Sequence, residues 1–325
     1  MSGVEPTMRR VALIHNPVSG QNSTRRSAIL RDALAVLHSA GIETVELETS
    51  GQGSGRALVA EAVRRECDTV IACGGDGTVH EILQCLVGTE MALGVLPFGT
   101  ANALAQNLGL GTSPVRAVRM LLTATPTAVP VGRILYRDSS GDESSRYFTV
   151  AAGIGLDALL MSRPDPELKR RFGYAMYVFE VMRIWATHSF PLFDAKVLSA
   201  GSDEPWEEQV SQVLAIRVRS FGGLLGKLAP GASLHNGRLR LVAFKTRSRL
   251  RYFRFLIAVL AKRHTFTGGI ELVKAISVEC AATSGSRETI YVEADGEVLG
   301  TLPAKIEVAP HPLTLTLLIP GHARP

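Results

Sequence analysis

A glycine-rich turn that carries one carboxylate, Gly74-Gly75-Asp76-Gly77-Thr78, has residue types and spacing suited to binding a phosphate. Glycines put no Cβ between the backbone and a ligand, so backbone N–H groups can face an anion. A carboxylate at Asp76 is favourable beside that anion only if a divalent metal or a transferable proton is also there. The alternative is an ordinary strand-to-helix turn in which Asp76 caps the helix. The turn alone leaves both interpretations open.

Two more loops of small polar residues follow apolar runs at 11–14 and 92–97. They contain Asn16, Ser19 and Gly20 in the first loop and Gly99, Thr100 and Asn102 in the second. Open α/β sheets bind ligands outside the carboxyl ends of their strands, which is where these residues are expected. Asn16-Pro17 by itself is also typical of a plain turn. Hydrogen-bond donors without added charge are therefore expected beside the glycine-rich turn.

Strands and helices alternate in the N-terminal part of the chain. Apolar runs predict strands at 11–14, 44–47, 70–73 and 92–97, and helical spacing predicts helices at 28–37, 56–65 and from residue 79 onward. Such alternation predicts a parallel sheet whose loops gather along one edge. The Walker A pattern does not occur in the sequence, which excludes the usual P-loop.

From about Val129 the pattern changes to short alternating segments, which predict an antiparallel β sandwich or barrel. The expected strands are 132–136, 147–151, 193–198, 213–218, 238–244, 276–280, 289–293, 306–308 and 313–319. Helical spacing predicts two interruptions, at 167–187 and 250–262. The predicted fold is thus an α/β domain followed by a β-rich domain.

Composition and charge narrow the possible functions. The chain has 325 residues, of which 46% are hydrophobic, and this is enough for about two domains with a large core. Its 4 cysteines show no metal-ligand spacing, so we expect reduced thiols in a cytoplasmic protein. No apolar run is long enough to span a membrane, so any membrane contact should be peripheral.

The formal charge of +5 is modest, but cations cluster in the window from Lys245 to Arg263. Aromatic and aliphatic residues alternate with these cations, as in helices that lie at the surface of an anionic membrane. The alternative is a helix packed on the β sandwich with an ordinary charged outer face. The sequence leaves both open.

Four ordered blocks together resemble the diacylglycerol kinase and sphingosine kinase family of soluble lipid kinases. They are Asn16-Pro17-Val18-Ser19-Gly20, Gly74-Gly75-Asp76-Gly77-Thr78, Pro97-Phe98-Gly99-Thr100-Ala101-Asn102 and Val292-Glu293-Ala294-Asp295-Gly296-Glu297. The resemblance implies an ATP-binding α/β domain at 1–130, related to phosphofructokinase and NAD kinase and joined by the C-terminal segment from about 306 to 325. It implies a β-rich lipid-substrate domain at 131–305. The activity implied is transfer of the γ-phosphate of ATP, with Mg²⁺, to the hydroxyl of a membrane lipid.

Residue roles carried over from this family follow the matching motif positions. Asn16, Ser19 and Gly20 resemble nucleotide contacts, and Gly74, Gly75, Gly77 and Thr78 resemble a phosphate cradle. Asp76 resembles the aspartate that orders magnesium-bound water or takes the substrate proton. Asp295 resembles a general base, with Glu297 near the metal, although Asp-Gly in isolation favours a plain hairpin turn. Asp157 resembles an acid that recognises a lipid head group, and its alternative is a helix N-terminal acid.

Two departures from the family pattern bear on the substrate. Ala103 and Asn236 stand where many members carry acids, and the first change removes a group associated with the metal and its waters. These changes leave the acceptor open among diacylglycerol, a sphingoid base, ceramide and phosphatidylglycerol. The rival functions are an NAD kinase-like enzyme and a catalytically inactive lipid or nucleotide binder. Monomer and homodimer are both compatible with the sequence, and nothing in it indicates nucleic-acid binding.

Overall fold

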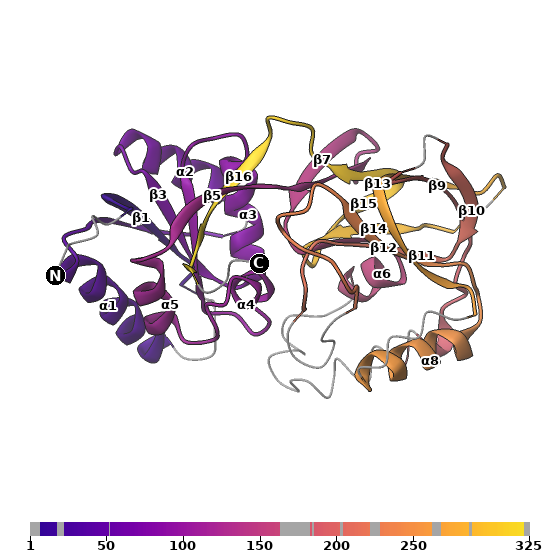
Figure 1. Cartoon of the computed structure of the whole chain (residues 1–325), viewed down its shortest axis with the longest axis horizontal. Helices are drawn as coiled ribbons and strands as arrows, with labels where there is room; N and C mark the ends of the chain where they lie inside the picture. Colours follow the sequence, from indigo (N-terminus) through magenta and orange to yellow (C-terminus); the bar gives the residue numbers. More distant parts are fainter. Residues whose placement is uncertain are drawn as a thin grey trace. The chain divides into compact units, whose positions relative to one another are not determined.

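The chain forms two compact units. The computed structural model describes residues 7–17, 23–51, 53–162, 183, 185–201, 204–221, 228–261, 268–285 and 288–321. The α/β unit comprises Met1–Val131, Ser220–Gly223 and Ala309–Pro325, and the β unit comprises Gly132–Arg219 and Leu224–Val308 (Figure 1). The two sheet types predicted from the sequence, a mainly parallel one and an antiparallel one, are both present.

The α/β unit is built on a sheet with the strand order β2-β1-β3-β4-β16-β5. Its strands are β1 (Arg10–His15), β2 (Glu43–Glu48), β3 (Thr69–Gly74), β4 (Ala92–Pro97), β5 (Thr125–Pro130) and β16 (Thr314–Ile319). Neighbours are parallel except for β5, which pairs with β16 in antiparallel orientation. The sequence did not predict β5, because its sequence Thr-Pro-Thr-Ala-Val-Pro contains two prolines, which disfavour a strand prediction.

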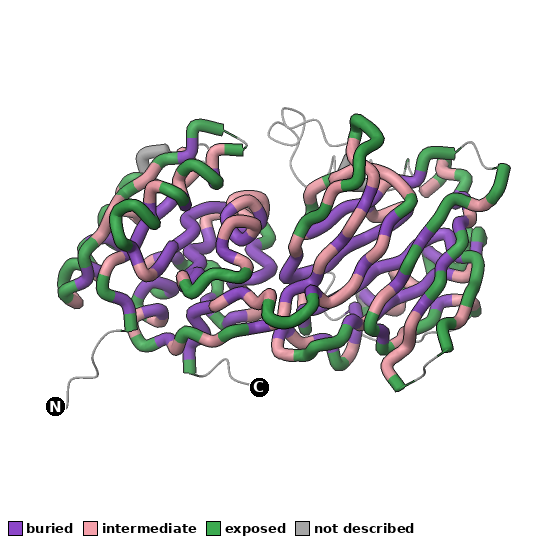
Figure 2. Tube along the Cα trace, turned by 90° about the horizontal axis from the view of Figure 1, so that it is seen from above, coloured by how far each residue is buried: buried purple, intermediate pink, exposed green. Residues whose placement is uncertain are grey.

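Helices cover this sheet. They are α1 (Ser23–Ser39), α2 (Gly55–Arg64), α3 (Asp76–Leu86), α4 (Ala103–Asn107) and α5 (Pro114–Leu121). The chain steps from β1 to β2 in one direction and from β2 through β3 to β4 in the other, so right-handed crossovers put α1 on one face and α2 and α3 on the opposite face. Every residue of β3 and β4 is buried, which explains their continuous apolar sequences (Figure 2).

The β unit is an antiparallel sandwich. Its strands are β6 (Gly132–Arg137), β7 (Glu143–Phe148), β8 (Ala151–Gly155), β9 (Phe193–Ser199), β10 (Trp206–Val210), β11 (Gln212–Ile216), β12 (Leu239–Phe244), β13 (Ile270–Ala282), β14 (Tyr291–Ala294) and β15 (Glu297–Val308). The long strands β13 and β15 pair with each other and so close the ring β13-β12-β11-β8-β14-β15 around a core of Val, Ile, Leu, Phe and Ala side chains. Two described helices, α6 (Leu156–Ser162) and α8 (Arg249–Leu260), also belong to this unit.

The strands of the β unit differ from the sequence predictions in several places. The expected strand at 147–151 is wrong, because β7 ends at Phe148 and β8 begins at Ala151. Strand β10 was not predicted, since its sequence Trp-Glu-Glu-Gln-Val is mostly polar at the exposed sheet edge. The segments at 276–280 and 306–308 extend to the full lengths of β13 and β15. Most of the helix expected at 167–187 lies outside the described residues.

Within the described part of the chain, we find no helix with the length and apolar character needed to cross a bilayer. Cys67, Cys73, Cys85 and Cys280 are all free thiols. Burial raises the pKa of the Cys73 and Cys280 thiols, which keeps them protonated and unreactive.

We expect Gly300→Ala to destabilise the β unit. A Cβ at Gly300 would overlap the carbonyl oxygen of Arg137 on the neighbouring strand β6, so the strands would have to separate. Overpacking of this kind costs about 1–3 kcal/mol of unfolding free energy. Urea unfolding should show this loss, whereas Gly237→Ala, where a Cβ would meet no atom within 4 Å, should not. Equal stability of the two variants would contradict the close strand contact.

Candidate active site

Three loops of the α/β unit leave the carboxyl ends of adjacent parallel strands β1, β3 and β4. Asn16 begins the first loop, and its backbone N–H donates to the Cys73 carbonyl at 3.2 Å. Ser19 and Gly20 lie outside the described residues. The turn at 74–78 joins β3 to α3, and Thr100 is an exposed residue of the loop between β4 and α4. The fold therefore gathers the described polar loops at one edge of the sheet, as predicted.

The glycines of these loops allow close backbone packing. A Cβ added at Gly99 would lie 2.6 Å from the Gly75 Cα atom, so the two loops are in direct contact at these residues. A Cβ at Gly74 would overlap the Thr78 side chain, which folds back over the strand end. Part of the glycine pattern is therefore explained by packing within the protein, and Gly74 in particular makes room for Thr78.

The N-cap residue of helix α3 makes no side-chain capping hydrogen bond. Gly75 occupies the N-cap position and Gly77 lies in the first turn, so no side chain is available from either residue. The first N–H groups of a helix have no acceptor within the helix, and the helix dipole makes this end positive. The arrangement suits an anion such as a phosphate.

Asp76 bonds to the loop that leads into α4. Its Oδ2 accepts the N–H of Asn102 at 2.9 Å, and its Oδ1 accepts the N–H of Ala103 at 2.7 Å. The Asn102 side chain in turn closes its own loop, accepting the Gly99 N–H at 2.8 Å and donating to the Gly99 carbonyl at 2.7 Å. Asn102 has a φ of 47°, a left-handed conformation that Asn tolerates better than most residues. The Asp76 carboxylate thus fixes the β4–α4 loop beside the start of α3.

The second predicted acid, Asp295, lies in the tight turn between β14 and β15. Asp295 and Gly296 have φ values of 49° and 88°, as a two-residue type I′ hairpin requires. The carboxylate accepts the N–H groups of Thr149, Val150 and Ala151 at 2.9, 2.8 and 3.0 Å, and the Thr149 hydroxyl at 3.3 Å. A carboxylate offers about four lone-pair positions, so these donors fill it.

These bonds also explain the interruption between β7 and β8. Thr149 and Val150 turn their N–H groups toward Asp295, so these groups are not available to a neighbouring strand. The Asp295 N–H donates in return to the Ala151 carbonyl at 2.8 Å. Asp295 is therefore both the predicted functional acid and a residue of the predicted hairpin turn. Glu297 follows as the first residue of β15 and is half-buried.

Glu293 and Asp157 form a buried carboxyl pair close to this turn. A Cβ built on Gly153 would lie 2.7 Å from Asp157 Oδ2 and 2.8 Å from Glu293 Oε1, so the two oxygens converge over that glycine. Burial raises the pKa of Asp157, and burial together with the nearby Asp157 charge raises the pKa of Glu293 well above its ordinary value. The convergence of the two oxygens and the raised pKa values favour a proton held between them. The other oxygen of Glu293 accepts the Gly296 N–H at 2.9 Å, which ties the pair to the turn.

Arg217 is a positively charged residue in this region. It is fully buried, and its Nη2 amino group donates to the carbonyls of Leu234 at 3.0 Å and Asn236 at 3.3 Å. Burial lowers the pKa of Arg217 to about 10, and the negative charge of Asp295 acts in the opposite direction. The guanidinium therefore stays charged at neutral pH and compensates a carboxylate in the interior.

Sequence reasoning assigned separate roles to Asp157, Asp295 and Glu297 but none to Glu293 or Arg217. The signal for both was a charged residue inside an apolar strand pattern, Val292-Glu293-Ala294 and Ala215-Ile216-Arg217-Val218. Such residues are buried only when paired. Asp157 belongs to the first turn of α6, as its alternative interpretation expected, and it also contacts Glu293.

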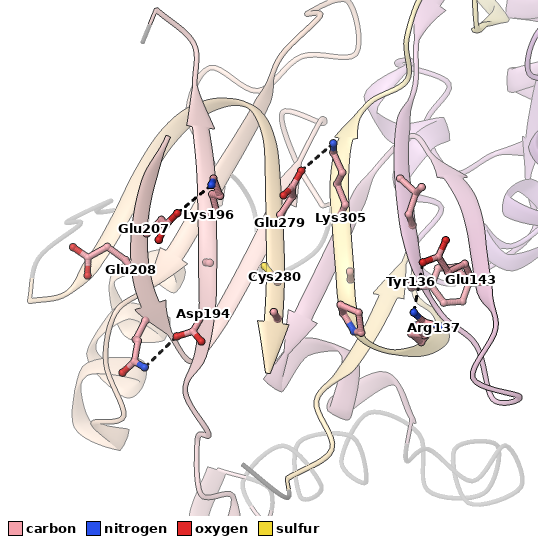
Figure 3. Close-up of a pocket in the computed structure, with 16 residues that line it drawn as sticks. Tyr136, Arg137, Glu143, Asp194, Lys196, Glu207, Glu208, Glu279, Cys280 and Lys305 are labelled. Atoms are coloured by element: carbon pink, nitrogen blue, oxygen red, sulfur yellow. Dashed lines mark hydrogen bonds and ion pairs between the residues drawn. The ribbon is translucent and has the colours of Figure 1, made fainter. Parts of the chain in front are cut away.

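A hollow of about 890 Å³ on the outer face of the β unit lies elsewhere (Figure 3). Its wall carries the ion pairs Lys196–Glu207 at 3.1 Å, Lys305–Glu279 at 3.0 Å and Arg137–Glu143 at 3.5 Å. None of the predicted site residues lines it. Because its charges are paired with one another, we do not assign the active site to this hollow.

Among the described residues, no three His, Cys, Asp or Glu side chains gather closely enough to hold a metal on their own. This donor set does not fit a protein-enclosed zinc site. It fits Mg²⁺, which is usually held by one or two carboxylates together with water and substrate phosphates. Asp76, beside the positive end of α3, has the chemistry for this role.

We expect Asp76→Asn to loosen the β4–α4 loop. The amide keeps one acceptor oxygen but turns an NH₂ group toward the N–H of Asn102 or Ala103, so one hydrogen bond is replaced by a repulsive contact. The loss should be about 1–3 kcal/mol. Hydrogen exchange at Asn102 and Ala103 measures it, with the exposed Asp32→Asn as the control. Unchanged protection of these amides would contradict the role of Asp76.

We expect Glu293→Gln to change the pH dependence of stability. The raised pKa values mean that the folded chain keeps a proton that the unfolded chain loses, so this stabilisation is present below the unfolded pKa and disappears as pH rises through the folded pKa. Gln supplies a permanent N–H donor to Asp157. The Tm of the native chain should therefore fall relative to Glu293→Gln as the pH rises above the ordinary carboxyl range and through the raised pKa of the pair.

Thermal unfolding across this pH range measures the difference. The control is Glu90→Gln, an exposed carboxyl after α3, and it should give a Tm profile parallel to that of the native chain. Parallel profiles for Glu293→Gln and the native chain would show that the pair does not share a proton.

Comparison with known proteins identifies the family. Residues 10–134 match the diacylglycerol kinase catalytic domain, and residues 150–317 match the YegS C-terminal NAD kinase beta sandwich-like domain. A diacylglycerol kinase of Mycobacterium tuberculosis is 30% identical over 323 residues, which are 96% of each chain. A diacylglycerol kinase of Bacillus subtilis is 27% identical over 301 residues, covering 92% of this chain and 93% of the relative.

The fold agrees with this result. A crystal structure of a diacylglycerol kinase from Bacillus anthracis superposes with a TM-score of 0.72 and 22% sequence identity, and it covers 98% of this chain and 99% of that chain. The two matched domains correspond to the α/β unit and the β unit described above. The chain therefore belongs to the lipid kinase family in which a diacylglycerol kinase catalytic domain is followed by a YegS-type β sandwich.

Proposed function

We propose that this protein is an ATP-dependent lipid kinase that transfers the γ-phosphate to the hydroxyl of a membrane lipid of the diacylglycerol or sphingosine type. The observation that carries the proposal is the uncapped, positive end of α3, held against the β4–α4 loop by Asp76. Family membership supports phosphoryl transfer. The reaction would take place at the cytoplasmic face of a membrane and supply phospholipid synthesis.

The nucleotide would bind at the edge formed by the three loops of the α/β unit. Phosphoryl transfer depends mainly on positioning and on stabilising charge, so backbone donors are suited to it. The residues proposed to contact the nucleotide are Asn16, Ser19, Gly20, Gly74, Gly75, Gly77, Thr78, Gly99, Thr100 and Asn102. Their N–H and hydroxyl groups would bind the phosphates without adding charge, and the rigid contact between Gly75 and Gly99 keeps two of the loops in register.

Asp76 and Glu297 are the proposed magnesium-binding residues. A bound Mg²⁺ ion would screen the negative charges of the phosphates during transfer. The Asp76 carboxylate already accepts two backbone N–H groups, so its orientation is set before any ligand arrives. This preorganisation is what a site for charged phosphates requires.

Asp295 is the proposed acceptor of the substrate proton. Its carboxylate is filled by donors, so a lipid hydroxyl can bind only by replacing one of them. The Thr149 hydroxyl, at 3.3 Å, makes the longest of these bonds and is the donor most easily replaced. The substrate O–H would then donate to Asp295 Oδ2, and the proton would pass to this oxygen as the phosphate transfers. Asp76 remains the other candidate for this role.

The residues that depart from the family pattern still have defined contacts. Ala103 contributes its backbone N–H to Asp76, and any residue except proline supplies this donor. Asn236 accepts an N–H of Arg217 through its backbone carbonyl. Both replacements therefore leave these backbone contacts in place.

We expect the full chain, incubated with labelled ATP and Mg²⁺, to phosphorylate a dispersed lipid. The panel is diacylglycerol, sphingosine, ceramide and phosphatidylglycerol, with NAD as a separate substrate. Asp295→Asn and Asp76→Asn should each lower kcat by about 100-fold or more, because each removes a charge proposed to act in the transfer.

A matched control is Asp138→Asn. Asp138 also accepts two backbone N–H groups in a turn of the β unit, those of Ser140 and Asp142, but no role in transfer is assigned to it. It should keep near-native kcat. Label in NAD and not in lipid would support the rival NAD kinase-like enzyme, and no label in any acceptor would support an inactive binder.

A further inference from the structure

Helix α8 has apolar side chains on two opposite faces. On the inner face Tyr252 and Val259 are buried against the sandwich. On the outer face Leu250, Phe253 and Ile257 are 64%, 40% and 48% exposed. Their spacing of three and four residues places them in one stripe. A helix that is apolar all round is normally buried, so the exposed stripe calls for an explanation.

The inner face fixes the orientation of the helix. The Tyr252 ring stacks on Phe244 at 4.6 Å between centroids and contacts Phe190, also at 4.6 Å. The Tyr252 and Ser211 hydroxyls are hydrogen-bonded at 2.8 Å. Phe255 meets the edge of Phe244 at 5.1 Å. Because rotating α8 would break all these contacts, the outer stripe cannot turn inward.

The exposed stripe is continued by a tryptophan. The Trp185 ring lies 5.9 Å from that of Phe253, and its Nε1 donates to the Arg249 carbonyl at 3.1 Å. Tryptophan is favoured at the boundary between water and lipid, where one end of the ring is apolar and the other can be hydrated. The other large exposed apolar side chains of the described residues, Val63, Ile276 and Val298, lie on three different elements.

Arginines surround the stripe. On the helix wheel Arg249 lies on one side of the stripe, and Arg254 and Arg251 lie on the other. All three are exposed. The segment from 246 to 261 contains no acidic residue, so no negative charge on α8 compensates them. Lys245, which the sequence placed in the same cationic window, is paired with Glu208 at 3.3 Å and Glu271 at 3.0 Å and does not contribute.

We propose that the outer face of α8, defined as Leu250, Phe253, Ile257 and the flanking Arg249, Arg251 and Arg254, docks on an anionic lipid bilayer. The apolar stripe would enter the headgroup boundary while the arginines meet lipid phosphates. A second copy of the chain fits less well, because a symmetric dimer would bring two sets of arginines together without acids. This inference rests on the proposed function in one respect, which is that the acceptor lipid resides in a bilayer. Lys262 and Arg263 lie outside the described residues.

The test is co-sedimentation of the full chain with vesicles of phosphatidylcholine alone or mixed with phosphatidylglycerol. We expect binding to the anionic vesicles that weakens as salt is raised. Leu250→Gln combined with Ile257→Gln should weaken this binding about tenfold or more, because it removes apolar area from the boundary. Arg251→Gln combined with Arg254→Gln should weaken it to a similar degree, since each cation near an anionic surface contributes.

Matched controls separate these effects from general changes in the charge and hydrophobicity of the protein surface. Arg116→Gln with Arg119→Gln removes two exposed arginines with the same spacing from α5, and Val63→Gln removes an exposed apolar side chain from α2. Both controls should bind vesicles like the native chain. Circular dichroism and thermal unfolding check that every variant is folded.

Several results would overturn the docking proposal: no binding of the native chain to anionic vesicles, equal binding by the α8 variants, or a native dimer in light scattering that the α8 variants abolish. Turnover of a detergent-dispersed acceptor is measured in parallel. Lost vesicle binding with retained turnover supports docking through α8. Vesicle binding through α8 without any lipid phosphorylation supports docking while rejecting the proposed function.

Discussion

The hydrogen bonds from the Asn102 and Ala103 amides to the Asp76 carboxylate are the contact on which the candidate nucleotide site depends. They join two loops that follow neighbouring parallel strands, and they compensate the start of α4, which no side chain of its own caps. The N-cap residue of α3 is Gly75, which has no side chain to cap the helix. At the edge proposed to bind the nucleotide, one acid thus serves a helix other than its own.

In the β unit, too, carboxylates accept backbone N–H groups from other segments of the chain, and they accept more of them. Asp295 collects the amides between β7 and β8 in a hairpin turn, and Glu293 holds the next residue of that turn. Burying several charges is costly unless they are paired or neutralised. Arg217 supplies a compensating positive charge, and a shared proton removes one of the negative charges from the Glu293–Asp157 pair. The turn is therefore held by backbone hydrogen bonds, and Arg217 offsets part of its negative charge.

Helix α8 illustrates a different constraint. Its inner face is committed to aromatic contacts with the sandwich, so its apolar outer face has no place inside the fold. The proposed substrate lies in a bilayer, and exposed apolar side chains among arginines would give the protein a surface that docks on that bilayer. The stability of the β unit and access to the lipid would then depend on opposite faces of one helix.

The sequence by itself determined the sheet types, the loops at the carboxyl ends of β1, β3 and β4, and the Asp-Gly turn. These features follow from local patterns of apolar spacing and turn residues, which act over a few neighbouring positions. It also indicated the family, because several ordered motifs are more specific than one.

Only the tertiary structure decided what the acids contact. Asp76 bonds to residues on the following loop, and Asp295 bonds to residues far earlier in the chain, at Thr149 to Ala151. The break in the expected strand at 147–151, the pairing of Glu293 with Asp157 and the burial of Arg217 all follow from such distant contacts. Local patterns cannot specify them, since the partner of a polar group is selected by packing of the whole unit.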